Sequence, residues 1–387
     1  MIKPSPKALR RCISPVCLPV LVGLAIPGAT TAAPLDELLS VQEETRPLHG
    51  EVEAGWDAMN STIDLFRVRK EDPRGKSIGD YTGQHLRGGL ALDKRLWVDG
   101  GFWNSTVKTP FDEGKNRTYQ AGIQYRVVDN KKYRPAISLR ISGWGNGTGQ
   151  IYKGSSTPVF GTGISADSFT IKDPSDRQFQ GDVIGSWALT PSTSISLFTS
   201  YGVSQVSIGD TYATLYGCNY KLDRVLLTDE VNGGWDTGVH GVAVNAKDPN
   251  CGLTEFTQSM SFYNAPDLPP GMYVSYDADY LQFGGMIQWR NEDWRLKLGY
   301  RLQTWDRGPL DEAVSALQHA DKTVYKTNNH ITGEVSYKIH PQVALFLRSQ
   351  YMTNQFLGDV PYAYNLLSSH QFDKPYGLVS LGVSAGF

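Results

Sequence analysis

The strongest constraint in this chain is a period-two alternation of apolar and polar residues, which begins at Gly50 and recurs up to the last residue. The final segment, 375–387, shows the pattern clearly, because small or polar residues separate its apolar ones and it ends on an aromatic residue. A strand with this alternation has one face in an apolar medium and the other against something polar. The apolar positions that carry the pattern are Val379, Leu381, Val383 and Phe387.

The same alternation predicts about twelve strands, joined by connectors that are short and long in turn. Short turns that alternate with long loops are typical of a membrane-spanning barrel, and an even strand count brings both termini to the short-turn end. The predicted strands are 50–59, 80–92, 94–106, 117–128, 134–145, 176–190, 192–205, 276–290, 293–305, 328–340, 342–353 and 375–387.

Charged residues recur on the face opposite the apolar one. In segment 293–305 the apolar face carries Trp294, Leu296 and Leu298, and the other face carries Arg295 and Lys297. This division predicts lipid outside and water or polar packing inside. Tyrosine, tryptophan and phenylalanine gather at both ends of the predicted strands, which fits the two interfaces of a membrane.

An apolar final strand with an aromatic carboxy-terminus, preceded by such strands and loops, resembles the Gram-negative outer-membrane β-barrel proteins, in particular porin-like ones. The resemblance covers nearly the whole mature chain as architecture and indicates no specific family. It implies an all-β fold, namely a transmembrane antiparallel up-and-down β-barrel of about 12 strands with short periplasmic turns and long outer loops. It also implies two partners, outer-membrane lipid and the barrel-assembly machinery that recognises the last strand.

The first 33 residues have the features of a signal peptide, which predicts export to the cell outer membrane. Basic residues precede an apolar stretch at 16–26, and small residues up to Ala33 suit cleavage. We expect residues 34–49 to form a periplasmic lead-in segment and 50–387 to form the barrel. After the leader there is no run of about 18 apolar residues, so no membrane helix is expected.

Removal of the leader leaves 33 basic residues against 39 acidic ones, a formal charge of −6, which argues against nucleic acid as a partner. The mature chain keeps Cys218 and Cys251, both in the long outer loop 206–275. A disulfide is the natural prediction for an exported protein, with two free thiols as the alternative. A second long loop, 146–175, is rich in Gly, Ser and Thr, and neither loop shows a strand pattern.

No catalytic constellation is evident, so we predict no enzyme and no cofactor. Outer-membrane phospholipases share a His-Ser-Asn cluster that no predicted strand carries here. Asp277, Asp279 and His240 match the Asp/His outer-membrane proteases in residue type alone, and a catalytic assignment needs geometry. The mature chain has no metal-binding spacing such as HxxxH or CxxC. An outer-membrane hydrolase is therefore the third hypothesis.

The informative residues are the inward-facing charges. The predicted inward acids weigh toward the first six strands, whereas the bases concentrate in the last five, where Glu334 stands nearly alone among them. This basic wall comprises Arg290, Arg295, Lys297, Arg301, Lys338 and Arg348.

Two interpretations compete. Basic walls favour anions, so the leading hypothesis is a porin-like passive channel for small polar or anionic solutes, including oligosaccharides. Alternatively, the charges pair across a narrow interior and plug it, since twelve strands lie between filled and open barrels. A closed barrel would then display its outer loops as an adhesin or receptor, or serve as the outer-membrane component of a surface-polysaccharide system.

Overall fold

The structure is a computed structural model of the whole chain. It describes residues 38–41, 47–59, 63, 80–108, 113–129, 134–153, 157–159, 164–207, 209–228, 235–249, 251–260, 276–308, 326–353 and 376–387. The predicted signal peptide, 1–33, lies outside these residues. Within them, no helix is long and apolar enough to span a membrane.

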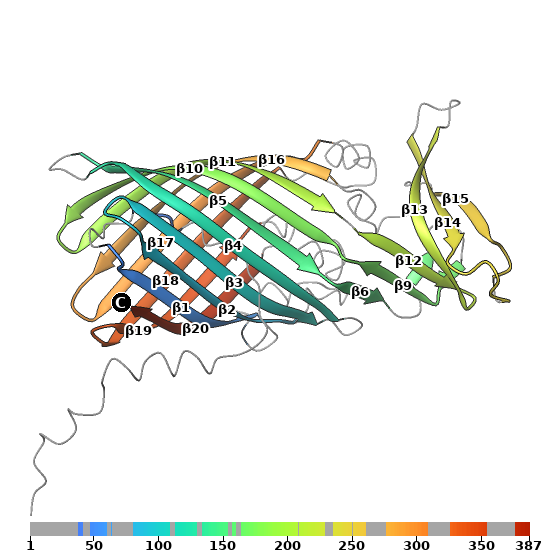
Figure 1. Cartoon of the computed structure of the whole chain (residues 1–387), viewed down its shortest axis with the longest axis horizontal. Coiled ribbons are helices and arrows are strands. Elements are labelled where there is room, and N and C mark those ends of the chain that lie inside the picture. Colours follow the sequence, from blue (N-terminus) through green and yellow to red (C-terminus); the bar gives the residue numbers. More distant parts are fainter. Residues whose placement is uncertain are drawn as a thin grey trace, which may run out of the picture.

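Twelve strands form one closed antiparallel barrel, and eight further strands lie beyond one of its ends (Figure 1). The barrel strands are β1 Gly50–Met59, β2 Asp80–Ala91, β3 Leu96–Lys108, β4 Glu113–Val128, β5 Ala136–Thr148, β10 Ser175–Thr190, β11 Thr193–Ser207, β16 Tyr276–Arg290, β17 Trp294–Asp306, β18 Thr327–His340, β19 Val343–Met352 and β20 Tyr376–Gly386. The others are β6 Gln150–Lys153, β7 Thr157–Val159, β8 Ile164–Ala166, β9 Ser168–Lys172, β12 Asp210–Leu215, β13 Cys218–Thr228, β14 Trp235–Ala243 and β15 Glu255–Met260.

The ring runs β1-β2-β3-β4-β5-β10-β11-β16-β17-β18-β19-β20, and β20 closes it by pairing with β1. All twelve predicted strands are confirmed, with ends that differ by a few residues. The seam is in register from Glu51 opposite Gly386 to Ala58 opposite Val379. Closure matters because it removes the unpaired strand edges that would otherwise invite aggregation.

The two faces of the strands divide as the alternation predicts. On β17, Leu298 is 55% exposed on the outside, whereas Arg301 is 2% exposed on the inside. On β20, Leu381 is exposed and Ser380 is buried. An outer face of exposed Leu, Val, Ile and aromatic side chains around a polar interior is the reverse of a soluble protein, and it suits a barrel in an apolar medium.

Exposed aromatic residues lie at both ends of the barrel strands. At the end of the barrel that carries the short turns, the rings of Trp294 and Tyr337 meet with their centroids 4.7 Å apart, and Phe387 is exposed at the end of β20. Toward the other end, Phe102 and Tyr119 are exposed on the neighbouring strands β3 and β4. Two such bands fit the two interfaces of a membrane, where aromatic rings are enriched.

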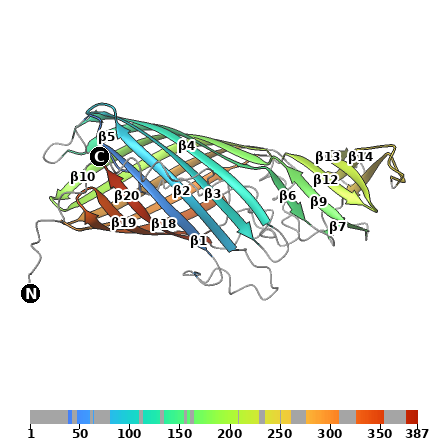
Figure 2. The same cartoon turned by 60° about the horizontal axis from the view of Figure 1, so that its bottom comes forward.

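The short connectors and the carboxy-terminus share one end of the barrel, which we call the short-turn end (Figure 2). The described connectors there are 92–95, 191–192, 291–293 and 341–342. Phe387 N–H donates to the Gly50 carbonyl at 3.0 Å, and the Gly50 N–H donates to the Phe387 carbonyl at the same distance. The last residue therefore belongs to the rim of the barrel.

The barrel seam depends on a close approach at Gly382. This residue of β20 pairs with Gly55 of β1, and the Phe346 ring of β19 lies against both. A Cβ on Gly382 would overlap the Ala54 carbonyl oxygen and lie 2.7 Å from the Cα of Gly55. The absence of a side chain there lets β20 sit flat against β1.

The prediction that segments 146–175 and 206–275 are loops without a strand pattern is wrong. Segments 146–175 and 206–275 contribute a six-stranded sheet in the order β15-β14-β13-β12-β9-β6, together with the β7–β8 hairpin. Figure 1 shows this outer sheet beyond the end of the barrel opposite the short turns. Apart from β13, which has 11 residues, the strands of this sheet have nine residues or fewer, so neither loop repeats the long alternation that marks the barrel strands.

One turn explains why the hairpin β12–β13 escaped the sequence analysis. Tyr216 and Gly217 both have positive φ, at 52° and 80°, and they join Leu215 to its partner Cys218. Two central residues with positive φ make the type I′ turn that suits hairpins, and Asn-Gly or Asp-Gly is its usual signal. Tyrosine is an uncommon residue for that conformation, so the turn has no recognisable sequence signature.

The predicted disulfide is present. Cys218 and Cys251 are bonded across 33 positions, and Cys218 is fully buried. Around it pack the edge-on rings of Tyr220 and Phe256, whose centroids are 5.1 Å apart, and Tyr220 donates to the Leu253 carbonyl at 3.0 Å. This small core stabilises one face of the outer sheet.

Replacing both cysteines, Cys218→Ser with Cys251→Ser, is expected to loosen the outer sheet and leave the barrel intact. The bridge closes a loop of about 34 residues, which corresponds to roughly 4 kcal/mol in the chain-entropy model. Limited proteolysis should cut segment 206–275 faster, while the folded barrel keeps its fast migration on an unheated gel. Loss of that fast-migrating band, or unchanged proteolysis, would contradict this division between sheet and barrel.

Candidate functional site in the barrel lumen

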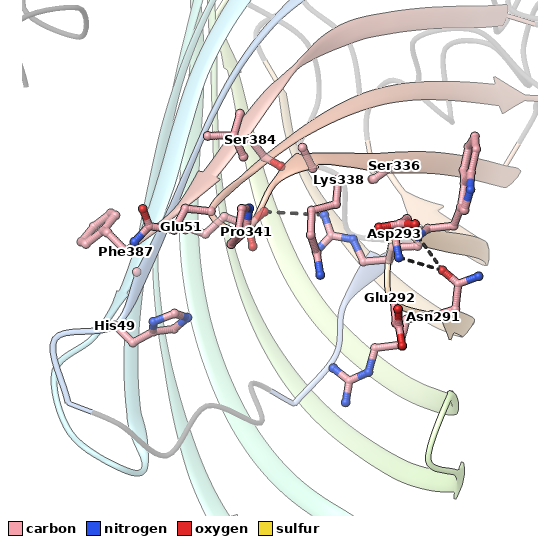
Figure 3. Close-up of a pocket in the computed structure, with 18 residues that line it drawn as sticks. His49, Glu51, Asn291, Glu292, Asp293, Ser336, Lys338, Pro341, Ser384 and Phe387 are labelled. Carbon is pink, nitrogen blue, oxygen red and sulfur yellow. Dashed lines mark hydrogen bonds and ion pairs between the residues drawn. The ribbon is translucent and has the colours of Figure 1, made fainter. Parts of the chain in front are cut away.

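A pocket of about 560 Å³ opens at the short-turn end of the barrel (Figure 3). Strands β1, β16, β17, β18, β19 and β20 and their turns surround it, so it forms the mouth of the lumen. Arg290, Arg295 and Lys338 supply its bases, and Glu51, Glu292 and Asp293 supply its acids.

A second cavity of about 190 Å³ lies deeper in the lumen and shares Glu51 and Arg295 with the mouth. Its lining has five basic side chains and three acidic ones, so the surface of the cavity carries an excess of positive charge. The bases are Arg87, Arg140, Arg295, Lys297 and Arg348, and the acids are Glu51, Glu53 and Asp99.

Arg348 is the centre of the first charge cluster in the lumen. Its Nη1 and Nη2 donate to the two carboxylate oxygens of Glu53 at 2.8 Å each. Its Nε and Nη2 donate to Glu334 Oε2 at 2.9 and 2.6 Å. Lys297 Nζ lies 3.2 Å from the other Glu334 oxygen. A guanidinium that satisfies two carboxylates at once is held in a fixed orientation.

The closing strand leaves room for this cluster. Arg348 is on β19 and Glu53 is on β1, so the guanidinium must cross β20, which lies between them. The residues of β20 opposite Arg348 and Glu53 are Ser380 and Ser384, both buried and small. The small inward face that the last strand shows in the sequence is thus what lets one arginine bridge the seam.

His85 extends the cluster toward the opposite end of the barrel, which carries the long loops and which we call the long-loop end. Its Nε2 lies 3.1 Å from Glu53 Oε1, and its Nδ1 lies 2.9 Å from Asp57 Oδ2. The imidazole is buried, with the Phe346 and Trp103 rings nearby at centroid distances of 6.1 and 6.4 Å. A histidine held between two carboxylates links β2 firmly to β1.

Arg140 forms a second cluster on the opposite side of the ring. Its Nη2 donates to Asp99 Oδ1 at 2.9 Å, and its Nη1 approaches Asp182 Oδ2 at 3.4 Å. Asp99 is on β3 and Arg140 is on β5, so the side chain crosses β4, where Gly122 lies opposite Asp99. A Cβ on Gly122 would come within 2.6 Å of the guanidinium.

A chain of amides continues from this cluster around the wall. Gln180 accepts hydrogen bonds from Tyr280 Oη at 3.0 Å and from Gln282 Nε2 at 2.7 Å. Arg301 Nη1 donates to Gln282 Oε1 at 3.0 Å, and its Nη2 lies 2.8 Å from His330 Nδ1. Most of the lumen circumference is therefore lined by mutually bonded polar groups.

These bonds run along the wall. Arg348 and Glu53, Arg140 and Asp99, and Gln180 with both Tyr280 and Gln282 lie two strands apart in the ring, and the other pairs above lie on neighbouring strands. A longer reach in the described lumen is Arg295 Nη2 to Glu51 Oε1, 3.8 Å, from β17 to β1 at the mouth. The paired side chains therefore lie along the inner surface of the barrel wall, and other groups occupy the space near the barrel axis.

One of those groups is the lead-in segment. Residues 38–41 lie inside the lumen, where the Val41 N–H donates to Ser186 Oγ at 2.9 Å and Gln124 Nε2 donates to the Ser40 carbonyl at 3.2 Å. Val41 is 2% exposed. The segment contacts β4 and β10, which lie across the ring from the Arg348 cluster on β19. The 190 Å³ cavity lies between them, because its lining includes both residues 38–40 and Arg348.

The six predicted bases thus occupy three levels. Arg290 and Lys338 lie at the rim, Arg295 joins the rim to the deeper cavity, and Lys297 and Arg348 line that cavity. Arg301 is buried nearer the long-loop end, beside His330. Whether these residues form a path for anions stays a prediction.

Sequence reasoning placed Glu53 and Glu334 inside the lumen but did not predict that they pair with Arg348 of the basic wall. Glu53 lies 295 positions before Arg348, and closure of the ring places their strands two apart. The sequence signal for this contact was the pairing of the first and last strands, combined with the inward parity of both side chains.

The residues considered for an enzyme are not brought together. His240 lies on β14 of the outer sheet and contacts Thr257 at 3.0 Å, whereas Asp277 and Asp279 lie on barrel strand β16. Among the described residues, no group of three or more His, Cys, Asp or Glu could hold a metal ion.

No protein-family model matches the chain, and no curated protein matches its sequence. The structure is similar to solved outer-membrane barrels. One is the translocator domain of the autotransporter NalP from Neisseria meningitidis, with TM-score 0.44 and 10% identity over 90% of this chain and 91% of that one. Another is the CymD monoaromatic hydrocarbon channel, with TM-score 0.40 and 11% identity over 94% and 95%.

A third is the KdgM porin in complex with disordered oligogalacturonate, with TM-score 0.36 and 7% identity over 87% of this chain and 99% of that one. These neighbours are porins, channels and translocator domains, which is the architecture predicted from the sequence. At such identities and TM-scores, the likenesses carry no argument about what this chain binds or transports.

Proposed function

We propose that this protein is an outer-membrane β-barrel of a Gram-negative bacterium whose lumen passes small polar solutes and favours anions. The membrane part of the proposal is supported by the exposed apolar outer face, by the aromatic residues at both strand ends and by the predicted signal peptide. The last strand, with Val379, Leu381, Val383 and Phe387, would then present its apolar face to the assembly machinery and to lipid.

The observation that carries the channel proposal is the direction of the lumen ion pairs. If Arg348 or Arg140 reached an acid on the far wall, it would close the passage. Within the described residues, both instead pair with acids one or two strands away, so these pairs leave a lumen between the walls. Twelve strands give a bore between that of a filled eight-strand barrel and that of an open sixteen-strand porin.

The preference for anions is supported by the lining of the 190 Å³ cavity, where five bases and three acids face the cavity and the acids Glu334 and Asp182, which pair with these bases, do not line it. Arg295 lies where the mouth and the deeper cavity meet, and Lys338 lies at the mouth. An anionic solute entering from the short-turn end would meet these side chains first, and basic groups lower the barrier for anions.

The test is the swelling of proteoliposomes in an acidic disaccharide and in a neutral disaccharide of the same size. The wild-type chain should admit the acidic sugar faster. In the variant Arg295→Gln with Lys338→Gln, the ratio of the two rates should fall roughly threefold or more, toward one, since each lost charge weakens the local field.

The matched control is Lys172→Gln with Lys221→Gln, which removes the same charge from the outer sheet. Lys221 is paired there with Asp210 at 2.8 Å, and this hydrogen bond lowers the pKa of the Asp210 carboxyl below its ordinary value. The control should keep the wild-type ratio. Equal rates for both sugars in the wild-type chain would refute the anion preference, and no swelling in either would refute the channel.

A second candidate function, a surface receptor for glycans, is favoured by the outer sheet. One cross-strand row on its solvent face holds aromatic and hydrogen-bonding side chains, a composition suited to sugars. The row is Tyr152, Thr170, Tyr212, Lys221 and Val242. The protein should bind immobilised glycans, and reduction of the disulfide should abolish this binding while the channel activity stays unchanged.

A further inference from the structure

The lumen wall carries an apolar patch that the channel proposal does not explain. Ala136 on β5, Ile184 on β10 and Phe198 on β11 all point inward, although their neighbours along the same strands are Ser, Asp and Arg. An apolar patch inside a water-filled lumen is unfavourable unless something covers it.

The chain's own lead-in segment covers it. Val41 packs into the patch, where Val41, Ala136, Ile184 and Phe198 form one buried cluster, and Leu39 lies against it. Burial of a valine side chain contributes about 1.5 kcal/mol or more. The apolar patch and the apolar side chain of Val41 thus shield each other from water in a lumen that is otherwise polar.

Polar contacts fix the segment in place. Ser186 Oγ accepts from the Val41 N–H at 2.9 Å and lies 2.7 Å from Ser196 Oγ, so neighbouring strands hold the acceptor. Gln124 holds the Ser40 carbonyl. These contacts come from β4 and β10, which places the segment across several strands of the wall.

The docked segment narrows the lumen. The described lead-in residues after it, 47–49, lie at the rim, where the Leu48 N–H donates to the Ala91 carbonyl at 2.7 Å. The chain therefore runs from inside the lumen to the rim before β1 begins. The 190 Å³ cavity lies between residues 38–40 and the part of the barrel wall that carries Arg348.

We propose that residues 38–41 are a displaceable plug, held by the apolar patch of Ala136, Ile184 and Phe198, and that its release widens the anion path. Among the described residues, Val41 and Leu39 and two hydrogen bonds hold the plug, so its free energy of docking is small enough for reversible release. The proposal rests on the proposed channel for its effect on transport, but the docking itself does not.

The test compares bilayer conductance of the wild-type chain with that of Val41→Asp, which places a charge in the apolar patch. Because a buried unpaired carboxylate is unfavourable, the segment should leave the wall and the mean conductance should rise, by roughly fivefold on the expectation that pore width limits conduction. The control Leu48→Asp makes the same change at an exposed lead-in residue, and it should behave as wild type.

Locking the plug gives the converse result. In Val41→Cys with Ile184→Cys, cross-linking by a short thiol-specific linker should lower conductance below that of the uncross-linked protein, with Val41→Cys alone as the control for treatment. Conductance that is equal and measurable in the wild-type, Val41→Asp and cross-linked proteins would overturn the plug and leave the channel standing. Cross-linking without conductance in any variant would overturn the channel, and failure to cross-link would overturn the docking.

Discussion

Replacing Gly382 with alanine is expected to stop most chains from closing the barrel. The new Cβ would overlap the Ala54 carbonyl oxygen and crowd the backbone of Gly55, so the collision is with main chain that cannot rotate away. Overpacking of this kind costs about 3 kcal/mol or more when neither side can give. It falls on the β1–β20 pairing that closes the ring.

The measurement is the fraction of chain that migrates as a compact, heat-modifiable band after refolding into lipid. We expect Gly382→Ala to lower that fraction severalfold. Gly386→Ala is the control, since it changes the same lumen face of the same strand where the nearest atom to a new Cβ, the Gly50 carbonyl oxygen, is 3.8 Å away. Equal refolding of the two variants would show that the close approach at Gly382 is dispensable.

Replacing Arg348 with methionine is expected to destabilise the folded barrel by about 3 kcal/mol or more, because two buried carboxylates lose the guanidinium that they share. Glu53 would lose two hydrogen bonds of 2.8 Å, and Glu334 would lose two more. The loss affects β1, β18 and β19 together, so the midpoint of urea unfolding in lipid should fall markedly.

Two further variants separate the causes. Arg95→Met removes a guanidinium of similar reach from an exposed pair with Asp129, and it should leave the midpoint unchanged. Combining Arg348→Met with Glu53→Gln should recover much of the lost stability, because Glu334 keeps Lys297 at 3.2 Å and the variant loses one charge of each sign. If this double variant is as unstable as Arg348→Met, the cost comes from lost packing against Phe346, whose ring lies 4.7 Å from the guanidinium.

The barrel could be predicted from the sequence because its information is local and repeated. Each strand shows its own alternation, as in segment 293–305, where Leu298 faces outward and Arg301 faces inward. The pairing of the first and last strands followed from closure alone. Since the period of a strand is two, parity fixes which side chains enter the lumen even where strand ends are misplaced.

The outer sheet and the lumen contacts could not be predicted, for two different reasons. Strands β12 and β13 are joined by a Tyr-Gly turn that has no standard signature, and their alternation is short. In the lumen, Arg348 meets Glu53 only because the ring closes, and Val41 meets Phe198 only because the chain folds back inside. Parity places a side chain on a face without giving its partner.

We propose that a charged, passable lumen runs through this barrel. The most direct test is the reversal potential of the Val41→Asp chain in a planar bilayer across a potassium chloride gradient. We predict discrete conductance steps and a reversal potential displaced toward the chloride equilibrium potential, with the displacement reduced by Arg295→Gln and Lys338→Gln. No steps above the bare bilayer, or a displacement toward the potassium equilibrium potential, would contradict it.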